Sequence, residues 1–149
     1  MYIFKIVPIG KPRMTQRDKW LERNATAQYW LYKDVLNLAA RQQKFVIGKV
    51  IDVLFLLPMP QSWSKKKQDS MRGESHGGKP DTDNLLKAFC DALTTDDSLI
   101  WDKRGRKYWW DYGAIVVLNN LDVTGKIAFD RMLSEFEKKN GELKQILSA

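Results

Sequence analysis

Acidic residues gather in one short part of this chain, from residue 81 to residue 102. Six carboxylates stand there against a single basic residue, Lys87, although the protein as a whole carries a net charge of +7. Carboxylates that converge repel one another unless a divalent cation neutralises them. A ligand set that is all oxygen, without paired His or Cys, favours Mg²⁺ or Mn²⁺ over zinc. The stretch is therefore a candidate metal site, with Asp81, Asp83, Asp91, Asp96, Asp97 and Asp102 as its acidic residues.

The spacing of three residues in this stretch predicts a shared surface. Asp83, Lys87 and Asp91 are four residues apart, so a helix from about residue 83 to 93 places them on one polar face. A metal ion beside a phosphodiester activates water and stabilises charge on the phosphoryl oxygens, and a lysine adds positive charge there. The competing interpretation is that Asp81 or Asp83 caps the helix and that Asp83 forms an ordinary surface pair with Lys87.

Basic residues dominate the sequence around this stretch. The isoelectric point near 9.5 predicts attraction to polyanions, with nucleic acid and an anionic membrane as the two broad classes of partner. Residues 61–79 are predicted to form a basic flexible loop, and residues 13–23 form a second basic segment that includes Trp20. His76 is expected at the surface of the loop. The predicted DNA-binding residues are Arg13, Lys65, Lys66, Lys67, Arg72, Lys79, Arg104 and Arg106.

Strands are expected in four parts of the chain. Residues 2–9 and 49–59 are rich in β-branched and aromatic residues, and the nearly continuous apolar run of the second predicts a strand buried on both faces. Another strand is expected to begin at residues 99–101, to turn through the basic residues 103–107, and to return as residues 108–119.

Three helices and a short final helical piece are expected. Residues 83–93 form the helix that carries the acidic face, and residues 125 or 126 to 139 form another, which Gly141 separates from the last piece. Residues 25–44 show amphipathic spacing, with an apolar stripe that consists of Trp30, Leu31, Val35, Leu38 and Ala39.

The 149 residues are expected to form a single domain. The only cysteine, Cys90, excludes an internal disulfide and is expected to be a small core residue in a reducing compartment. The apolar opening of the chain lacks the basic region and cleavage site of a signal peptide. Its longest apolar run, residues 50–57, is too short to span a bilayer. We therefore expect a soluble cytoplasmic protein with no membrane partner.

The acidic stretch also carries a family resemblance. The chain resembles the RusA family of Holliday-junction resolvases, many encoded by phages and prophages, in the run Lys79-Pro80-Asp81-Thr82-Asp83-Asn84-Leu85-Leu86-Lys87-Ala88, continued by Asp91-Ala92-Leu93 and Asp96-Asp97-Ser98. Its segments 10–15, 18–20, 58–60 and 62–64 are similar to those of phage members. The resemblance extends over most of the chain up to about Trp109.

The resemblance implies an α+β fold, with a small mixed β-sheet packed with two to three helices, assembled as a homodimer. It also implies a bacterial protein that binds four-way DNA junctions and, with Mg²⁺ or with Mn²⁺ in its place, makes paired symmetric nicks. By position, Asp81 and Asp83 are the expected metal-binding aspartates, Lys87 the catalytic lysine and Asp97 the third aspartate.

The third metal ligand stays open among three residues. Only residues 92–95 lie between Asp91 and the second acidic pair, fewer than in the family members that the chain resembles. Asp96 and Asp102 are therefore alternatives to Asp97.

Two other functions fit the same sequence. A non-catalytic DNA-binding or architectural protein needs only the basic loops, with its carboxylates serving capping and solubility. A nuclease for flaps, forks or other branched DNA uses the same acidic chemistry. A membrane-surface protein is disfavoured because the basic residues lie in loops and not along one helix face.

Overall fold

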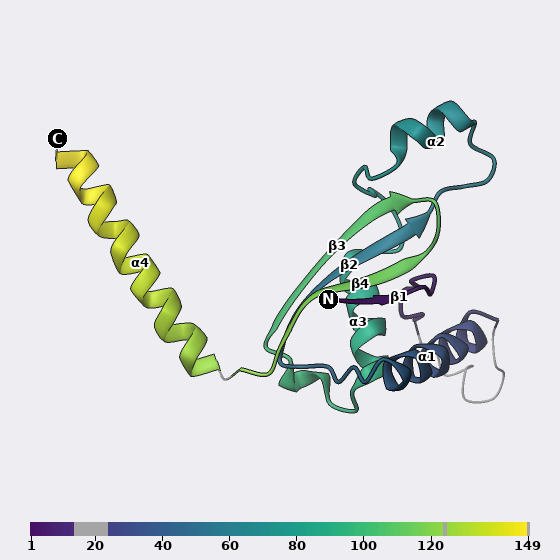
Figure 1. Cartoon of the computed structure of the whole chain (residues 1–149), viewed down its shortest axis with the longest axis horizontal. Coiled ribbons are helices and arrows are strands. Elements are labelled where there is room, and N and C mark those ends of the chain that lie inside the picture. The colour runs from purple at the N-terminus through teal and green to yellow at the C-terminus, as the bar shows by residue number, and fades with distance from the viewer. Residues whose placement is uncertain (14–23, 124, 149) are drawn as a thin grey trace.

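A four-stranded mixed sheet carries the fold, with two helices packed on one of its faces (Figure 1). The computed structural model describes residues 1–13, 24–123 and 125–148. The α+β class and the mixed sheet expected from the sequence are confirmed. The elements are β1 (Tyr2–Phe4), α1 (Asn24–Gln42), β2 (Val50–Pro58), α2 (Lys65–Met71), α3 (Thr82–Leu93), the 3₁₀ turn η2 (Asp97–Leu99), β3 (Asp102–Trp110), β4 (Ala114–Leu121) and α4 (Gly125–Ser148).

The sheet has the strand order β1-β4-β2-β3. Strand β2 pairs in parallel with β3 and antiparallel with β4, and β1 adds to the other edge of β4. The prediction that β2 is buried on both faces is wrong. Its residues alternate between buried and half-exposed because α1 and α3 cover only one face of the sheet. On that face Phe55 meets Phe89 of α3 edge to face, with 6.4 Å between the ring centroids.

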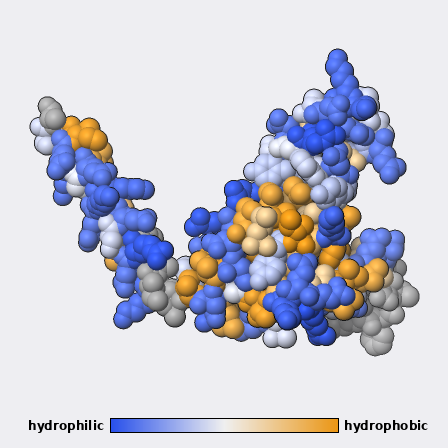
Figure 2. All heavy atoms as spheres, in the orientation of Figure 1, coloured by the Kyte–Doolittle hydropathy of each residue, from blue (hydrophilic) through white to orange (hydrophobic). Residues whose placement is uncertain are grey.

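The other face of the sheet has no helix upon it in the described part of the chain. Leu54 and Leu56 of β2 are half-exposed there, and the strand register places Ile3 of β1 and Val116 of β4 on the same side. Figure 2 shows apolar residues gathered over the strands. An open apolar sheet face is typical of a surface that meets a partner.

Helix α1 buries a different face from the one that its sequence predicts. Trp30, Leu31, Val35 and Leu38 are exposed, and only Ala39 of the predicted stripe packs partly against the core. The buried residues instead are Thr26, Tyr29, Tyr32, Leu36 and Ala40. Both stripes have helical spacing, so periodicity could not choose between them, and the two tyrosines bury apolar rings that an apolar count leaves out.

Strand β3 occupies the segment predicted as a turn. Residues 97–99 form η2, and β3 then runs without a break from Asp102 through the basic residues to Trp110, in register with β2 from Val50 to Pro58. The chain turns only after Trp110, so the predicted strand at 108–119 is divided between β3 and β4. An edge strand tolerates charged side chains because much of it faces solvent, and this is why the basic run misled the prediction.

The two ends of the chain differ from expectation as well. Strand β1 is shorter than the predicted strand at 2–9, and α4 continues through Gly141 to Ser148 where a break was predicted. A single glycine weakens a helix by about 1 kcal/mol but does not force it to end. Helix α3 occupies the predicted 83–93 segment, and Cys90 is fully buried as expected.

No helix in residues 1–13, 24–123 or 125–148 has the length and apolar character required to cross a membrane.

Candidate active site

The acidic stretch begins at the N-terminus of α3. Asp81 takes the N-cap position with extended backbone, φ −66° and ψ 147°, but its side chain makes no capping hydrogen bond. Asp83 and Lys87 project from the first two turns and are exposed. In the described part of the chain no ion pair joins Asp83 to Lys87, and Asp81 has no cationic partner. Neither the capping interpretation for Asp81 nor the surface-pair interpretation for Asp83 and Lys87 is therefore borne out.

Neighbouring strands hold this helix start in place. Lys107 of β3 donates hydrogen bonds to the carbonyl oxygens of Gly78 and Pro80, the latter at 2.7 Å, directly before Asp81. Gly105 of β3 lies so close to α3 that a Cβ there would stand 2.8 Å from two side-chain carbons of Leu86. The absence of a side chain at Gly105 therefore lets α3 approach the edge strand, and Lys107 fixes the chain that leads into it.

Asp91 has a structural role in holding the N-terminal segment against α3. Its carboxylate accepts a 2.7 Å hydrogen bond from Lys11 Nζ and a 3.4 Å hydrogen bond from the Tyr29 hydroxyl. Burial and the Asp91 charge together raise the pKa of Tyr29 to about 12. Sequence spacing grouped Asp91 with Asp83 and Lys87, but a partner 80 residues away neutralises it. Lys11 and Lys107 were missed by the sequence analysis, because neither stands near the acidic run in the chain.

Replacing Lys11 by Met should lower the free energy of unfolding by about 1 kcal/mol, since it leaves the half-buried Asp91 without its cation. Urea unfolding measures the change. Lys65→Met is the matched control, because Lys65 is exposed on α2 and is expected to change stability by no more than about 0.5 kcal/mol. Equal effects of the two substitutions would show that the Lys11–Asp91 contact stabilises nothing.

Asp96 and Asp97, the second acidic pair, have different surroundings. Asp96 caps η2, accepting hydrogen bonds from the hydroxyl and the backbone N–H of Ser98, which lower the pKa of its carboxyl group. Asp97 is half-buried, with Lys103 Nζ 3.6 Å from its carboxylate. Burial raises the pKa of the Cys90 thiol to about 11, and the nearby charge of Asp97 contributes in the same direction. Asp97 itself lies in η2, just after the C-terminal end of α3.

All three candidates for the third ligand have a partner in the structure. Asp97 pairs with Lys103 at 3.6 Å, Asp102 pairs with Arg104 at 3.5 Å, and Asp96 caps η2. In the described residues, however, no three side chains of His, Cys, Asp or Glu are grouped closely enough to hold a metal ion together. Asp81 and Asp83 lie together at the start of α3, and in the described residues Asp97 does not complete a group of three carboxylates with them. The assignment of Asp97 as third ligand stays a prediction.

Residues 61–79 are attached to the sheet. Helix α2 lies within this segment, and Ser64 caps it by accepting a hydrogen bond from Lys67 N at 3.2 Å. The segment after α2 then pairs with the free edge of β3 through backbone hydrogen bonds that include Gly73 N to Trp109 O at 2.8 Å and Trp109 N to Glu74 O at 3.0 Å. The predicted flexibility of the segment stays a prediction, but the structure gives it a helix and a docking edge.

His76 is buried beneath this segment, so the prediction of a surface histidine is wrong. Its ring lies 3.9 Å from that of Trp109, centroid to centroid, and only 7% of the residue is exposed. Burial, together with the positive charge of Lys107, lowers the pKa of His76, while its backbone hydrogen bond acts in the opposite direction. His76 is therefore neutral at pH 7 and anchors the segment by packing.

The predicted DNA-binding residues fall into two groups. Lys65, Lys66 and Lys79 are exposed and have no acidic partner in the described part of the chain. Lys67 is also exposed, with Nζ 4.3 Å from the ring centroid of Trp63. Three arginines are already paired with carboxylates, which are Asp69 and Asp111 for Arg72, Asp102 for Arg104, and Asp52 for Arg106.

Arg13 is exposed and ends the first described segment. The rest of the predicted basic segment at 13–23, including Trp20, lies outside the described residues.

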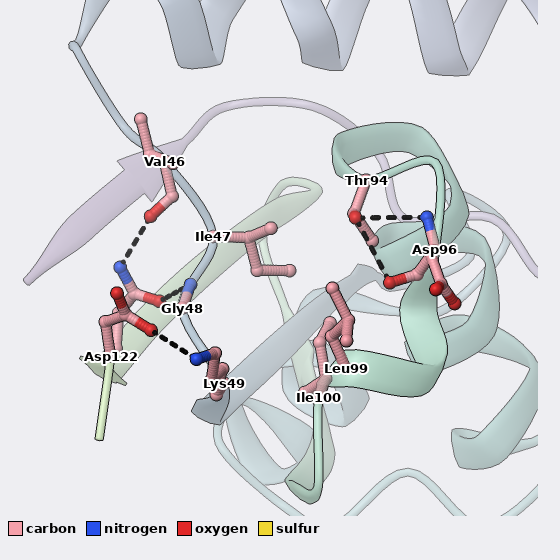
Figure 3. A pocket seen from close by; sticks show the side chains of 10 residues that line it. Val46, Ile47, Gly48, Lys49, Thr94, Asp96, Leu99, Ile100 and Asp122 are labelled. Atoms are coloured by element: carbon pink, nitrogen blue, oxygen red, sulfur yellow. Dashed lines mark hydrogen bonds and ion pairs between the residues drawn. The ribbon is translucent and has the colours of Figure 1, made fainter. Parts of the chain in front are cut away.

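Two hollows lie at opposite ends of α3. One, of about 410 Å³, is lined by Lys11, Lys79, Asp81 and Asn84, so carboxylate and amine groups meet there at the helix start. The other, of about 340 Å³, lies beyond the helix end near Asp96 (Figure 3). Polar groups in this second hollow hydrogen-bond to one another. The Asn120 side chain accepts a hydrogen bond from Gly48 N and donates one to the carbonyl oxygen of Val46. Asp81 and Lys79 line the first hollow and Asp96 lines the second, whereas Asp83, Lys87 and Asp97 are not among the lining residues of either.

A protein-family model matches most of the chain. Residues 4–118 match the protein family described as Endodeoxyribonuclease RusA. The matched region begins at the last residue of β1 and ends within β4, so it contains α1, β2, α2, α3 and β3 and excludes α4. No curated protein matches the chain.

Proposed function

Because the chain belongs to the RusA family of endodeoxyribonucleases, we propose that it resolves four-way DNA junctions by paired, symmetric hydrolysis of phosphodiester bonds. One observation carries the proposal beyond family membership. Asp81, Asp83 and Lys87 stand exposed at the start of α3, without ion-pair partners in the described part of the chain, inside a protein that is otherwise basic. Charged groups kept free at a rigidly held helix end are suited to chemistry and contribute little to folding.

We propose Mg²⁺ as the cofactor, with Mn²⁺ able to replace it. The all-oxygen donors Asp81 and Asp83 suit such an ion. Asp97, in the turn that follows the C-terminal end of the same helix, is the proposed third ligand. When bound, the metal supplies activated water and stabilises the charge on the phosphoryl oxygens.

The remaining groups act on the DNA. Lys87, one turn from Asp83, adds positive charge beside the scissile phosphate. The exposed lysines of α2 and Lys79 bind backbone phosphates, and each phosphate neutralised steepens the fall of affinity with salt. Two cuts related by symmetry need two equivalent sites, and each chain offers one acidic stretch, so we propose that the active form is a homodimer.

Incubation of the purified protein with a synthetic four-way junction and Mg²⁺ tests the proposal. We expect two nicks placed symmetrically across the junction, no cleavage in EDTA, and no cleavage of linear duplexes that carry the same arm sequences. Flap and fork substrates run in parallel. Equal cutting of flaps or forks would broaden the substrate to branched DNA, and equal cutting of linear duplex would exclude a structure-specific enzyme.

A further inference from the structure

Helix α4 exposes an apolar seam along its whole length. It lies beyond the family-matched residues, and Figure 1 shows it standing apart from the sheet and the other helices. Among its described residues, six large apolar side chains are between 40% and 76% exposed. Five of them form the seam, namely Phe129, Leu133, Phe136, Leu143 and Leu147, and the sixth, Ile146, lies beside it. A soluble helix seldom keeps such a surface without a partner to cover it.

The spacing of this seam is that of a coiled coil. From Phe129 the steps are four, three, four, three and four residues, provided that Asn140 fills the fourth position. These are the alternating d and a positions of a seven-residue repeat. On one side the seam is bounded by the charged e positions Asp130, Glu137 and Lys144, and on the other side the g positions are Met132, Lys139 and Ile146. Asn140 places a polar residue in the middle of this face, which a helix packed on a sheet normally lacks.

The helix also needs a partner for its own stability. Most helical stability in proteins comes from packing an apolar face. Gly141 weakens this helix further, by about 1 kcal/mol relative to alanine. Nothing lies within 4 Å of where a Cβ would stand at Gly141, so no close approach within the chain accounts for the glycine.

We propose that α4 pairs with α4 of a second copy of this chain as a parallel, two-stranded coiled coil. In the parallel arrangement Asn140 meets its counterpart, and the two amides can hydrogen-bond across the seam. A single Asn at an a position is a known determinant of register and oligomeric state. Both helix N-termini then lie at the same end, which keeps the two nuclease domains close together.

The antiparallel arrangement would gain an exposed ion pair but would leave the Asn140 amide without a partner, and the second effect is the larger. It would place Asp130 opposite Lys144 of the second copy, an exposed pair worth roughly 0.3–0.5 kcal/mol. It would also place Asn140 opposite Phe136, and a buried amide without a partner costs about 1–3 kcal/mol. The parallel form instead sets Lys139 near Lys144 of the second copy, an exposed repulsion that salt screens. The cost of the amide is the larger effect, so the parallel form is favoured.

Disulfide trapping in the full-length protein tests this arrangement. Leu147→Cys places a thiol at an a position, where the two copies meet in the parallel form only, and oxidation with diamide joins them. Gln145→Cys is the matched control, because it lies two residues away on the outer face of the same helix end. We expect Leu147→Cys to cross-link at least about tenfold faster, owing to its high effective concentration. Cys90 does not compete, since it is fully buried.

Seam substitutions make the test specific to α4. Adding Leu133→Glu and Phe136→Glu to Leu147→Cys should abolish the cross-link, whereas adding Lys138→Glu, on the outer face, should leave it unchanged. Equal rates for Leu147→Cys and Gln145→Cys would overturn the proposal, as would a cross-link that survives both seam substitutions. Cross-linking between Leu147→Cys and Phe129→Cys copies in a mixture would show the antiparallel form instead. The assay reads the protein alone, so its outcome is independent of nuclease activity.

Discussion

Asp83→Asn should lower the rate of junction cleavage by about 10²–10³-fold or more while leaving junction binding intact. The substitution keeps the size of the side chain and removes only its charge. The Asp83 side chain is exposed without an ion-pair partner among the described residues, so the free energy of unfolding should change by less than about 0.5 kcal/mol. Binding should hold or tighten, because one negative charge near the phosphates is lost. Single-turnover cleavage and gel-shift titration without metal measure the two effects.

The control for this result is Asp34→Asn, the same change at an exposed aspartate on α1, outside the proposed site. It should leave cleavage at the wild-type rate. A protein that only binds DNA would instead be inactive as wild type and show equal junction binding with either substitution. An Asp83→Asn protein as active as wild type would remove α3 from the proposed mechanism.

Phe89→Ala should have the largest effect on stability, lowering the free energy of unfolding by about 3–5 kcal/mol. Phe89 is fully buried between α3 and the sheet, where its ring packs edge to face with that of Phe55. Truncation removes apolar contacts and leaves a cavity in the layer that fixes α3 to the sheet. A loss of this size is a large fraction of the total stability of an ordinary domain. Urea unfolding followed by tryptophan fluorescence measures it.

Leu31→Ala on α1 is the informative control. Leu31 belongs to the apolar stripe predicted from the sequence, yet it is 63% exposed in the structure. Its truncation should therefore destabilise the protein far less than Phe89→Ala. The reverse ranking would show that α1 buries the stripe predicted from periodicity, and that the face seen in the structure is not the one that packs.

The sequence by itself determined the class of the fold and the helix that carries the acidic stretch. Helix α3 and its acidic start could be predicted because apolar spacing and carboxylate density are local properties of the chain. The resemblance carried by the same run led to the family that residues 4–118 match. The burial of Cys90 followed in the same way, from its place within an apolar helical run.

Only the tertiary structure decided which distant residues form ion pairs and hydrogen bonds, and which face of each element is buried. Lys11 neutralises Asp91 across 80 residues, and Lys107 holds the chain that leads into Asp81. Periodicity allowed α1 two faces, and the basic run led to a predicted turn in the middle of β3. Both choices depend on which surface the rest of the chain covers. Local patterns record what a segment prefers, whereas burial and ion pairing depend on partners that are brought close only when the chain folds.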